Sequence, residues 1–248
     1  MRSFGLTDKG KIRKDNQDSF VIDRCEAKGC IIVSLCDGMG GARAGGLAST
    51  LSNKAFVSYI YAKLTSRTNH SPDFKAVLQD ACAEANNVSY EYSQFDEAYN
   101  GMGTTIVGGV IKDSGNGYII NVGDSRAYHI SRKTSSIYQI TKDHSLVEEL
   151  VEYGAITKEQ AKNHPQRNVI TRALGSEAKV ESDYFEFTLL SGDLLLLCSD
   201  GLSNMVTDLE MLDYAKEYQE PELICRALMS KALNRGAKDN VTVVAVMK

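Results

Sequence analysis

The sequence contains no tryptophan, only three prolines and only four histidines among its 248 residues. It has no Cys-x-x-Cys pair and no His-x-x-x-His pair, which excludes the common zinc-binding patterns. No apolar stretch reaches about 18 residues, so we expect no insertion into a membrane. The first eight residues show no apolar signal-peptide core, and a net charge of −4 gives no indication of nucleic-acid binding. We therefore expect a cytoplasmic protein that binds no nucleic acid.

The composition is ordinary for a globular chain, with 43% hydrophobic and 24% charged residues. The length allows one sizeable core, and we treat residues 1–248 as a single domain. Two of the six cysteines, Cys36 and Cys198, lie inside apolar runs, where they are expected to be small buried side chains. We expect all six thiols to be reduced, as in a reducing compartment.

Four aspartates, each beside Gly, Ser or Asn, stand at an end of a short apolar run: Asp37, Asp124, Asp200 and Asp239. Runs rich in Val, Ile and Leu predict buried strands. Carboxylates at strand ends can converge in space, and converging oxygens bind hard cations such as Mg²⁺ or Mn²⁺. Taken singly, each Asp is more often a turn residue whose side chain bonds nearby backbone. Four repeats of one pattern favour a shared metal site.

Strands and helices are predicted in blocks. The patterns indicate strands within the first 35 residues, helices over 45–65 and 74–95, strands within 103–140 and 180–198, helices over 207–218 and 221–234, and a final strand over 240–247. Residues 145–164 are polar and helical in pattern, with Leu146, Leu150 and Val151 as a thin apolar stripe. Blocks of this kind predict antiparallel sheets covered by helices rather than a βαβ fold.

Six short motifs, in this order, resemble those of the metal-dependent protein phosphatases of type 2C, the PPM family: Asp15-Asn16-Gln17-Asp18, Asp37-Gly38-Met39-Gly40-Gly41, Gly101-Met102-Gly103-Thr104-Thr105, Gly123-Asp124-Ser125-Arg126, Ser199-Asp200-Gly201-Leu202 and Asp239-Asn240-Val241-Thr242. The stretches 143–147 and 164–175 resemble the bacterial branch in particular. Each motif alone is weak, but six in order are specific. The resemblance covers residues 4–248 with no large gap.

The resemblance implies an α+β fold, a central sandwich of two antiparallel β-sheets flanked by helices on both faces. It also implies the reaction, which is hydrolysis of phosphoserine and phosphothreonine in proteins by a metal-activated water, reversing Ser/Thr kinase signalling. Two ions, Mn²⁺ or Mg²⁺, are the implied cofactors, with a third in bacterial members. Phosphorylated proteins, including a Ser/Thr kinase and its substrates, are the implied partners. We expect a monomer, although the sequence does not establish the oligomeric state.

By resemblance, Asp37 would bridge two metal ions and Gly38 would offer its backbone carbonyl to one of them. Asp200 and Asp239 would complete the shell of the other ion. Asn240 would support this ion from beside the site. Two ions roughly 3.5–4 Å apart suit the reaction, because together they activate water and offset phosphoryl charge.

Four further positions carry roles by resemblance. Asp124, with Asp200, matches a third-metal position. Arg13 matches the arginine that grips substrate phosphate with its planar fork, and Asp18 matches a carboxylate that orients this arginine. Without the resemblance, Arg13 reads equally well as a solvated surface charge. Gln17 stands where many members have Glu, so it replaces an acidic, water-mediated contact beside one metal with a neutral amide.

The glycine-rich stretch departs from the family pattern. Met39 stands where other branches have His, so this position supplies no general acid. Ala42 and Gly46 stand where bacterial members often have His and Glu. We expect these departures to affect pH behaviour and metal affinity rather than the reaction class. The residues expected to carry catalysis are therefore Arg13, Asp37 and Asp239.

Three alternatives come from other classes. A cysteine phosphatase needs C-x5-R, but Cys36 and Arg43 are spaced C-x6-R, and Asp37 would oppose a thiolate. The glycine run 38–46 suggests nucleotide binding, but no Walker lysine follows it and no G-x-G-x-x-G opens a helix. The third is an inactive phosphatase fold that acts only by binding, which metal titration with a phosphopeptide distinguishes.

The polar segment 145–170 interrupts two stretches of strand character. Few buried contacts imply low local stability, and such segments often shape access to a site. We predict that it forms a mobile flap subdomain beside the cleft. The alternative is a solvated surface excursion with no role.

Overall fold

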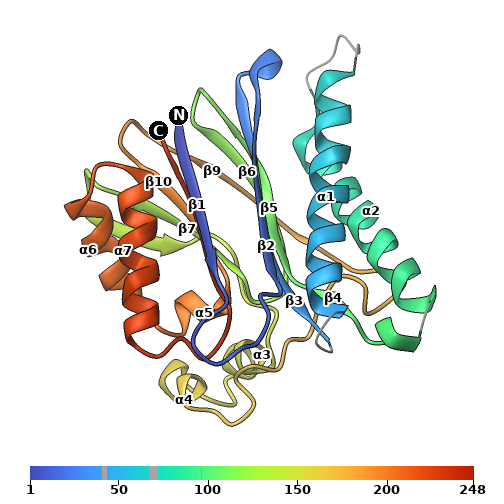
Figure 1. The fold of residues 1–248 in the computed structure, drawn as a ribbon. Coiled ribbons are helices and arrows are strands. Elements are labelled where there is room, and N and C mark those ends of the chain that lie inside the picture. The colour runs from blue at the N-terminus through green and yellow to red at the C-terminus, as the bar shows by residue number, and fades with distance from the viewer. Residues whose placement is uncertain (41–43, 67–71, 96) are drawn as a thin grey trace.

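Two antiparallel sheets lie face to face at the centre of the chain, with helices against the outer face of each (Figure 1). The structure is a computed structural model and describes residues 1–40, 44–66, 72–95 and 97–248. The α+β sandwich predicted from the sequence is confirmed. Within these ranges, no helix combines the length and apolar character needed to span a bilayer.

One sheet has five strands. In spatial order they are β1 (Arg2–Asp8), β11 (Val241–Met247), β10 (Leu194–Cys198), β7 (Arg126–Ser131) and β8 (Ser136–Gln139). In the antiparallel pair of β10 and β11, Cys198 opposes Val243. The residues that follow β10 and those that precede β11 therefore lie at the same edge of the sheet.

The other sheet has six strands. Its main path is β2 (Asp18–Cys25), β3 (Cys30–Met39), β5 (Ile106–Lys112), β6 (Asn116–Val122) and β9 (Asp183–Thr188), while β4 (Gly103–Thr104) pairs with the end of β3. Asp18, which begins β2, lies directly opposite Asp37 near the end of β3. The sheet thus brings two acidic residues from separate motifs to one edge.

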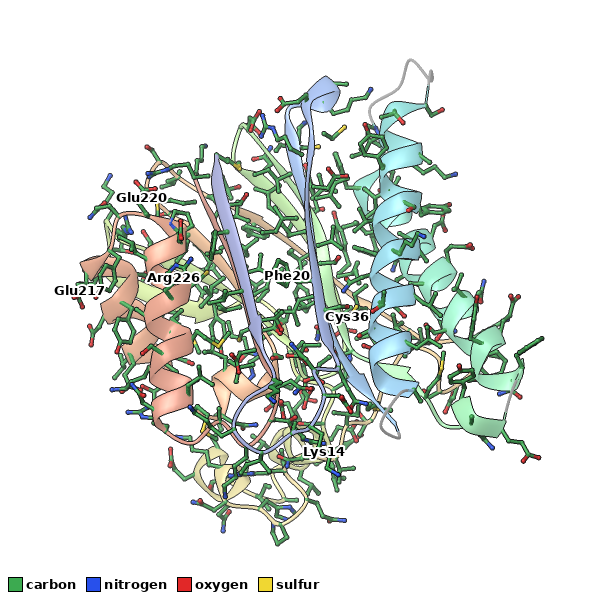
Figure 2. The ribbon with its side chains drawn as sticks, in the orientation of Figure 1. Lys14, Phe20, Cys36, Glu217, Glu220 and Arg226 are labelled. Atoms are coloured by element: carbon green, nitrogen blue, oxygen red, sulfur yellow. The ribbon has the colours of Figure 1, made fainter. Side chains whose placement is uncertain are left out.

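The strands alternate between two apolar layers because successive side chains of a strand point to opposite faces. On β3, Ile31, Val33 and Leu35 pack between the sheets. Ile32 and Cys36 pack on the other face, in the layer shared with the neighbouring helices, and Figure 2 shows Cys36 on the side of α1 (Ala44–Thr65). Burial on both faces explains why these strands are nearly continuous apolar runs.

The helices divide between the two outer faces (Figure 1). The first pair, α1 and α2 (Phe74–Phe95), covers the six-stranded sheet, and a second pair, α6 (Asp208–Glu217) and α7 (Pro221–Asn234), covers the five-stranded sheet. A reciprocal capping box between Thr207 and Glu210 starts α6. Pro221 occupies the first turn of α7, where no backbone donor is needed. The predicted bounds of these helices agree closely with the observed ones.

The prediction of helix over 145–164 is only partly correct. The structure has two short helices, α3 (Leu146–Glu152) and α4 (Lys158–Lys162), instead of one continuous helix. Gly154 separates them with a φ of +69°, a left-handed conformation that ends a right-handed helix. Both helices lie at the end of the sandwich that carries the short α5 (Asp200–Ser203) (Figure 1).

Candidate metal centre

Asp37 is held rigidly near the end of β3. Its parity along the strand matches that of Leu35, so it follows the face that packs between the sheets. Its backbone N–H donates to Thr105 Oγ1 at 3.0 Å, and its carbonyl accepts from Thr105 N and Thr104 Oγ1, each at 2.9 Å. Burial raises the pKa of Asp37 well above its ordinary value, and nearby negative charges raise it further, those of Asp18, Asp200, Asp124 and Asp239.

Gly38 occupies a space that has no room for a side chain. A Cβ there would lie 2.1 Å from the carbonyl oxygen of Gly45 and 2.6 Å from that of Gln17. The Gly38 N–H donates to the same Gln17 oxygen at 3.1 Å. Only glycine permits this close approach of backbone segments. The use of its carbonyl as a metal ligand stays a prediction.

Asp200 and Asp239 flank the neighbouring strands β10 and β11, which places both at the edge reached by Asp37. Burial raises the pKa of Asp200 to about 8, and the charges of Asp124, Asp239 and Asp18 add to this effect. Its Oδ2 accepts from Asn204 at 3.1 Å. Its Oδ1 is buried and finds no hydrogen-bond partner among the described residues.

Asp124 reaches this group from the turn between β6 and β7. Burial raises its pKa to about 6, and the charges of Asp143 and Asp239 act in the same direction, whereas that of Arg126 opposes them. Asp124 is also the neighbour whose charge contributes most to the raised pKa of Asp200. The two carboxylates predicted to share a third ion therefore interact electrostatically.

The role predicted for Asp18, that of orienting Arg13, stays a prediction. The Asp18 Oδ2 accepts hydrogen bonds from Ser199 Oγ at 2.8 Å and from Thr242 Oγ1 at 2.6 Å, and Arg13 donates to Asp239. Burial raises the pKa of Asp18 to about 6, while both hydroxyl donors oppose this rise. Because Thr242 belongs to β11, Asp18 ties the two sheets together at the acidic edge.

Arg13 lies in the loop between β1 and β2, next to Lys14, which Figure 2 labels in the lower half of the molecule. Its Nη2 donates to Asp239 Oδ2 at 2.7 Å. This hydrogen bond raises the pKa of Arg13, and the charges of Asp37 and Asp200 contribute as well. The guanidinium is half exposed, so it remains open to a phosphate from solvent.

Asn240 fastens the β1–β2 loop to the start of β11. Its Oδ1 accepts from the backbone N–H of Gln17 at 2.9 Å, and its Nδ2 donates to the carbonyls of Lys9 and Asp15, each at 3.0 Å. Asn240 thus supports the backbone of this loop, and the support of a metal ion predicted for it stays a prediction. The Gln17 backbone in turn accepts from Gly38, which links the loop to β3.

The residues present fit hard divalent cations. The candidate ligands are carboxylates, and buried oxygens of Asp18 and Asp200 lack hydrogen-bond partners among the described residues. A cation would satisfy the Asp200 oxygen and offset the negative charges that, after burial, raise the pKa values of this group. Among the described residues, no three Asp, Glu, His or Cys side chains lie close enough together to bind one metal ion as they stand. Instead, Asp239 faces Arg13, and Asp18 faces Ser199 and Thr242.

Sequence reasoning missed the hydroxyl residues that organise this edge: Thr104, Thr105, Ser199 and Thr242. All four belong to motifs that were singled out for their Asp or Gly residues. Their position beside those Asp and Gly residues was the one sequence feature that could have indicated a role. The sequence does not reveal which carboxylate or backbone group a hydroxyl will reach.

The cysteine-phosphatase alternative is contradicted. Cys36 is buried between β3 and the helices, and burial raises the pKa of its thiol well above the ordinary value. A reactive cysteine needs the opposite shift. All six cysteines are free and buried; burial was expected from the sequence for Cys36 and Cys198. Arg43 of this alternative and Ala42 of the family pattern lie outside the described residues.

Comparisons with known proteins agree with this geometry. The sequence model of the family described as "Protein phosphatase 2C" matches residues 11–235. The "Serine/threonine phosphatase stp" of Listeria welshimeri is 39% identical over 241 residues, covering 97% of this chain and 93% of the relative.

Two solved structures show the same fold. "Serine/threonine phosphatase Stp1 from Staphylococcus aureus" superposes with a TM-score of 0.88 at 36% identity, covering 99% of this chain and 94% of the other. The catalytic domain of the "serine threonine protein phosphatase PstP in complex with 2 Manganese ions" gives a TM-score of 0.81 at 32% identity, covering 98% and 96%.

Proposed function

This chain belongs to the protein phosphatase 2C family, and we propose that Asp37, Asp200 and Asp239 hold the divalent cations with which it dephosphorylates phosphoserine and phosphothreonine in proteins. That the chain is a metal-dependent protein-serine/threonine phosphatase follows from its family and its relatives. The observation that supports this set of ligands is the electrostatic repulsion between their carboxylates. Beyond the effect of burial, the charges of Asp200 and Asp239 raise the pKa of Asp37, and the charge of Asp239 raises that of Asp200, so carboxylates from both sheets interact at a single edge.

Each proposed ligand has its own place. Asp37 would serve both ions from β3, with the Gly38 carbonyl beside it. Asp200 and Asp239, which come from the other sheet, would hold one of the two ions. Asp124 and Asp200 would hold a third ion. The pairing of Asp124 with Asp200 is supported by the repulsion between their negative charges, because the charge of Asp124 raises the pKa of Asp200.

When bound, such cations supply an activated water and offset charge on the phosphoryl oxygens. The chain's own residues have other tasks. Arg13 offers a planar, permanently charged fork to the phosphate group. Its partial exposure keeps it accessible to substrate, while its bond to Asp239 holds it at the acidic edge. Asn240 fixes the loop that carries Arg13.

We propose two ions, Mn²⁺ or Mg²⁺, with room for a third. Support for two comes from the PstP relative, whose structure is described as a complex with two manganese ions. Oxygen ligands suit both metals. Gln17, a neutral amide where many family members have Glu, is proposed to weaken one of the sites.

The substrates are phosphorylated proteins, and we propose a Ser/Thr kinase and its targets among them. We also propose that the enzyme acts as a monomer in the cytoplasm. Six free, buried cysteines support a reducing compartment. The segment 145–170, whose helices lie at the acidic end of the sandwich, is proposed as a flap subdomain of one catalytic domain (Figure 1).

The test is phosphate release from a phosphothreonine peptide with added Mn²⁺ or Mg²⁺, with EDTA, and after Mn²⁺ is restored. Release should require the metal, vanish with EDTA and return with Mn²⁺. A phosphotyrosine peptide of the same sequence serves as the matched substrate control and should release little phosphate. Full activity in metal-free buffer would overturn the proposed metal centre. Metal binding without any phosphate release would instead identify a binding-only protein.

A further inference from the structure

His144 is a buried histidine, 5% exposed, that lies between β8 and α3 where the segment 145–170 begins. No role was predicted for it from the sequence. Its contacts join three parts of the fold that are far apart in the chain: the β6–β7 turn, the base of the 145–170 segment, and β9.

The first contact is a two-point clamp on Gly123. The Gly123 N–H donates to His144 Nδ1 at 3.0 Å, and the Gly123 carbonyl accepts from the His144 N–H at 2.9 Å. The same carbonyl accepts from Asn121 Nδ2 at 3.1 Å. Gly123 has a φ of +102°, and a Cβ there would lie 2.6 Å from Thr105 Cγ2. The peptide that leads into Asp124 is thus fixed on several sides.

The second contact sets the protonation of the ring. Because Nδ1 accepts a hydrogen bond, the neutral ring carries its proton on Nε2, which lies 3.3 Å from Asp183 Oδ2 on β9. Arg172 Nη1 lies 3.1 Å from the other oxygen of Asp183 and 3.3 Å from His144 Nε2. Nη1 and a protonated Nε2 are both donors, so they share Asp183 as acceptor rather than bond to each other. Burial lowers the pKa of His144, the charges of Arg172 and Lys142 add to this, and Asp183 opposes it. The neutral form, which the clamp requires, is therefore favoured.

The third contact closes the base of the 145–170 segment. The His144 carbonyl accepts from Thr171 N at 2.9 Å, and Leu146 N donates to the Val169 carbonyl at 2.9 Å. The residue between these two rungs, Ser145, forms a bridge with Ile170. The backbone of His144 thus belongs to the base of the segment, while its ring holds the turn before Asp124.

We propose that His144 is a positioning residue that fixes Asp124 at the metal edge and couples this carboxylate to the base of the 145–170 segment. It acts through the Gly123 peptide rather than by touching substrate. The proposal rests on the proposed role of Asp124 as a metal ligand. A loose turn would let Asp124 move away from Asp200, so the ion held by this pair would bind more weakly.

Two near-isosteric variants separate the two sides of the ring. In His144→Asn, the side-chain oxygen replaces Nδ1 and keeps an acceptor for Gly123. In His144→Gln, the amide nitrogen replaces Nε2 and keeps a donor for Asp183 but loses the Gly123 acceptor. Calorimetric titration of the full chain with Mn²⁺ should show one ion bound about fivefold to tenfold more weakly in His144→Gln, and changed by less than about twofold in His144→Asn. Equal losses in both variants would overturn the clamp.

Asp124→Ala and the double variant His144→Gln/Asp124→Ala distinguish the role of His144 from the proposed role of Asp124 as a metal ligand, on which it rests. If Asp124→Ala leaves every Mn²⁺ affinity unchanged, the metal role of Asp124 itself fails. If Asp124→Ala weakens one ion, His144→Gln should weaken that same ion and add nothing in the double variant. No effect of His144→Gln alone, or a full additional effect in the double variant, would overturn the role of His144.

Two controls keep the test independent of folding. His164→Gln removes a similar acceptor in the same segment, since His164 Nδ1 accepts from Gln166 N at 3.1 Å, and it should leave Mn²⁺ binding unchanged. Nitrogen NMR of the unmodified protein should show His144 neutral, protonated on Nε2, with its Nδ1 signal shifted by saturating Mg²⁺. A ring protonated on Nδ1, or one insensitive to Mg²⁺, would contradict the proposal even if His144→Gln did not fold.

Discussion

Nη2 of Arg13 lies 2.7 Å from Oδ2 of Asp239, so the group expected to bind phosphate is paired with a residue expected to bind metal. A divalent cation at Asp239 competes for the carboxylate that Arg13 now holds. Cation binding would therefore release the guanidinium toward substrate. Metal binding at Asp239 and phosphate binding at Arg13 would then be linked through this one ion pair.

Removing Arg13 should change metal and substrate binding in opposite directions. In Arg13→Ala, KM for a phosphothreonine peptide should rise about tenfold, because a charge-assisted fork to phosphate is lost. Mn²⁺ should bind slightly more tightly, by no more than about fivefold, because a partly exposed ion pair and its positive charge are removed. Steady-state kinetics and calorimetry measure both. Arg24→Ala, which breaks a pair with Asp113 directly after β5, at the opposite end of the sheet from Asp37, is the matched control.

The ligand assignment predicts a large loss of turnover when the carboxylate of a ligand is replaced by a neutral amide. Asp37→Asn and Asp239→Asn should each lower kcat by about a thousandfold, since several kcal/mol of charge stabilisation depend on the ions. The measurement is phosphate release at saturating Mn²⁺. Asp113→Asn, an equal change of charge at a surface ion pair, should retain turnover. If either ligand variant matches the parent enzyme, that residue holds no catalytic metal.

The metal-free protein should lose stability as pH rises. The pKa of Asp200 is raised to about 8 and that of Asp124 to about 6, both above the values expected when the chain is unfolded. A raised folded-state pKa gives stability that is present below the unfolded pKa and is lost as pH increases through the folded one. In EDTA, Tm should fall by at least about 5 °C between about pH 5 and about pH 8.5.

Two comparisons check the cause of this fall. Saturating Mg²⁺ should reduce it, because the cation offsets the charges that appear as the carboxylates ionise. Asp200→Asn should also reduce it in EDTA, because one titrating group is gone. A Tm in EDTA that stays level or rises over this pH range would mean that the carboxylates do not repel one another.

The 145–170 segment should matter more for large substrates than for small ones. Leu150 is half buried, and its carbonyl accepts from Ala155 and Ile156 where the chain leaves α3. Leu150→Ala removes half-buried apolar atoms at the end of α3, so it should loosen the segment and lower kcat/KM for a folded phosphoprotein about threefold to tenfold, while a small aryl phosphate changes less than about twofold. Leu209→Ala, at a 71% exposed leucine that begins α6, is the control. Equal effects on both substrates would leave the segment without a role in access.

The strands that carry the acidic residues were predictable because burial on both faces makes them continuous apolar runs. Leu194–Cys198 is such a run, and Asp200 follows it after a single serine. Strand ends could therefore be placed from local pattern alone. The helix over 145–164 could not be placed as well, since its polar pattern did not show that Gly154 would adopt a left-handed conformation.

The side-chain contacts of the site were not predictable from the sequence. Asp18 accepts hydrogen bonds from Ser199 and Thr242, which are 181 and 224 residues away. Such pairs depend on how the two sheets are stacked, and local spacing carries no information about that. The resemblance to a family gave Asp18 a role toward Arg13, but it did not indicate the hydrogen bond that joins this carboxylate to Thr242 of β11.

The acidic edge draws its carboxylates from both layers, with Asp37 on the six-stranded sheet and Asp239 at the start of β11 in the five-stranded sheet. Cations shared between them would act as a cross-link against sliding of one sheet over the other. Removal of the cations by a chelator would then allow local opening at this end of the sandwich. Hydrogen exchange of the backbone amides at the end of β3 and at the start of β11 would become faster, and the two strands would change together. The rigidity of the substrate-binding end would thus depend on the supply of divalent cations.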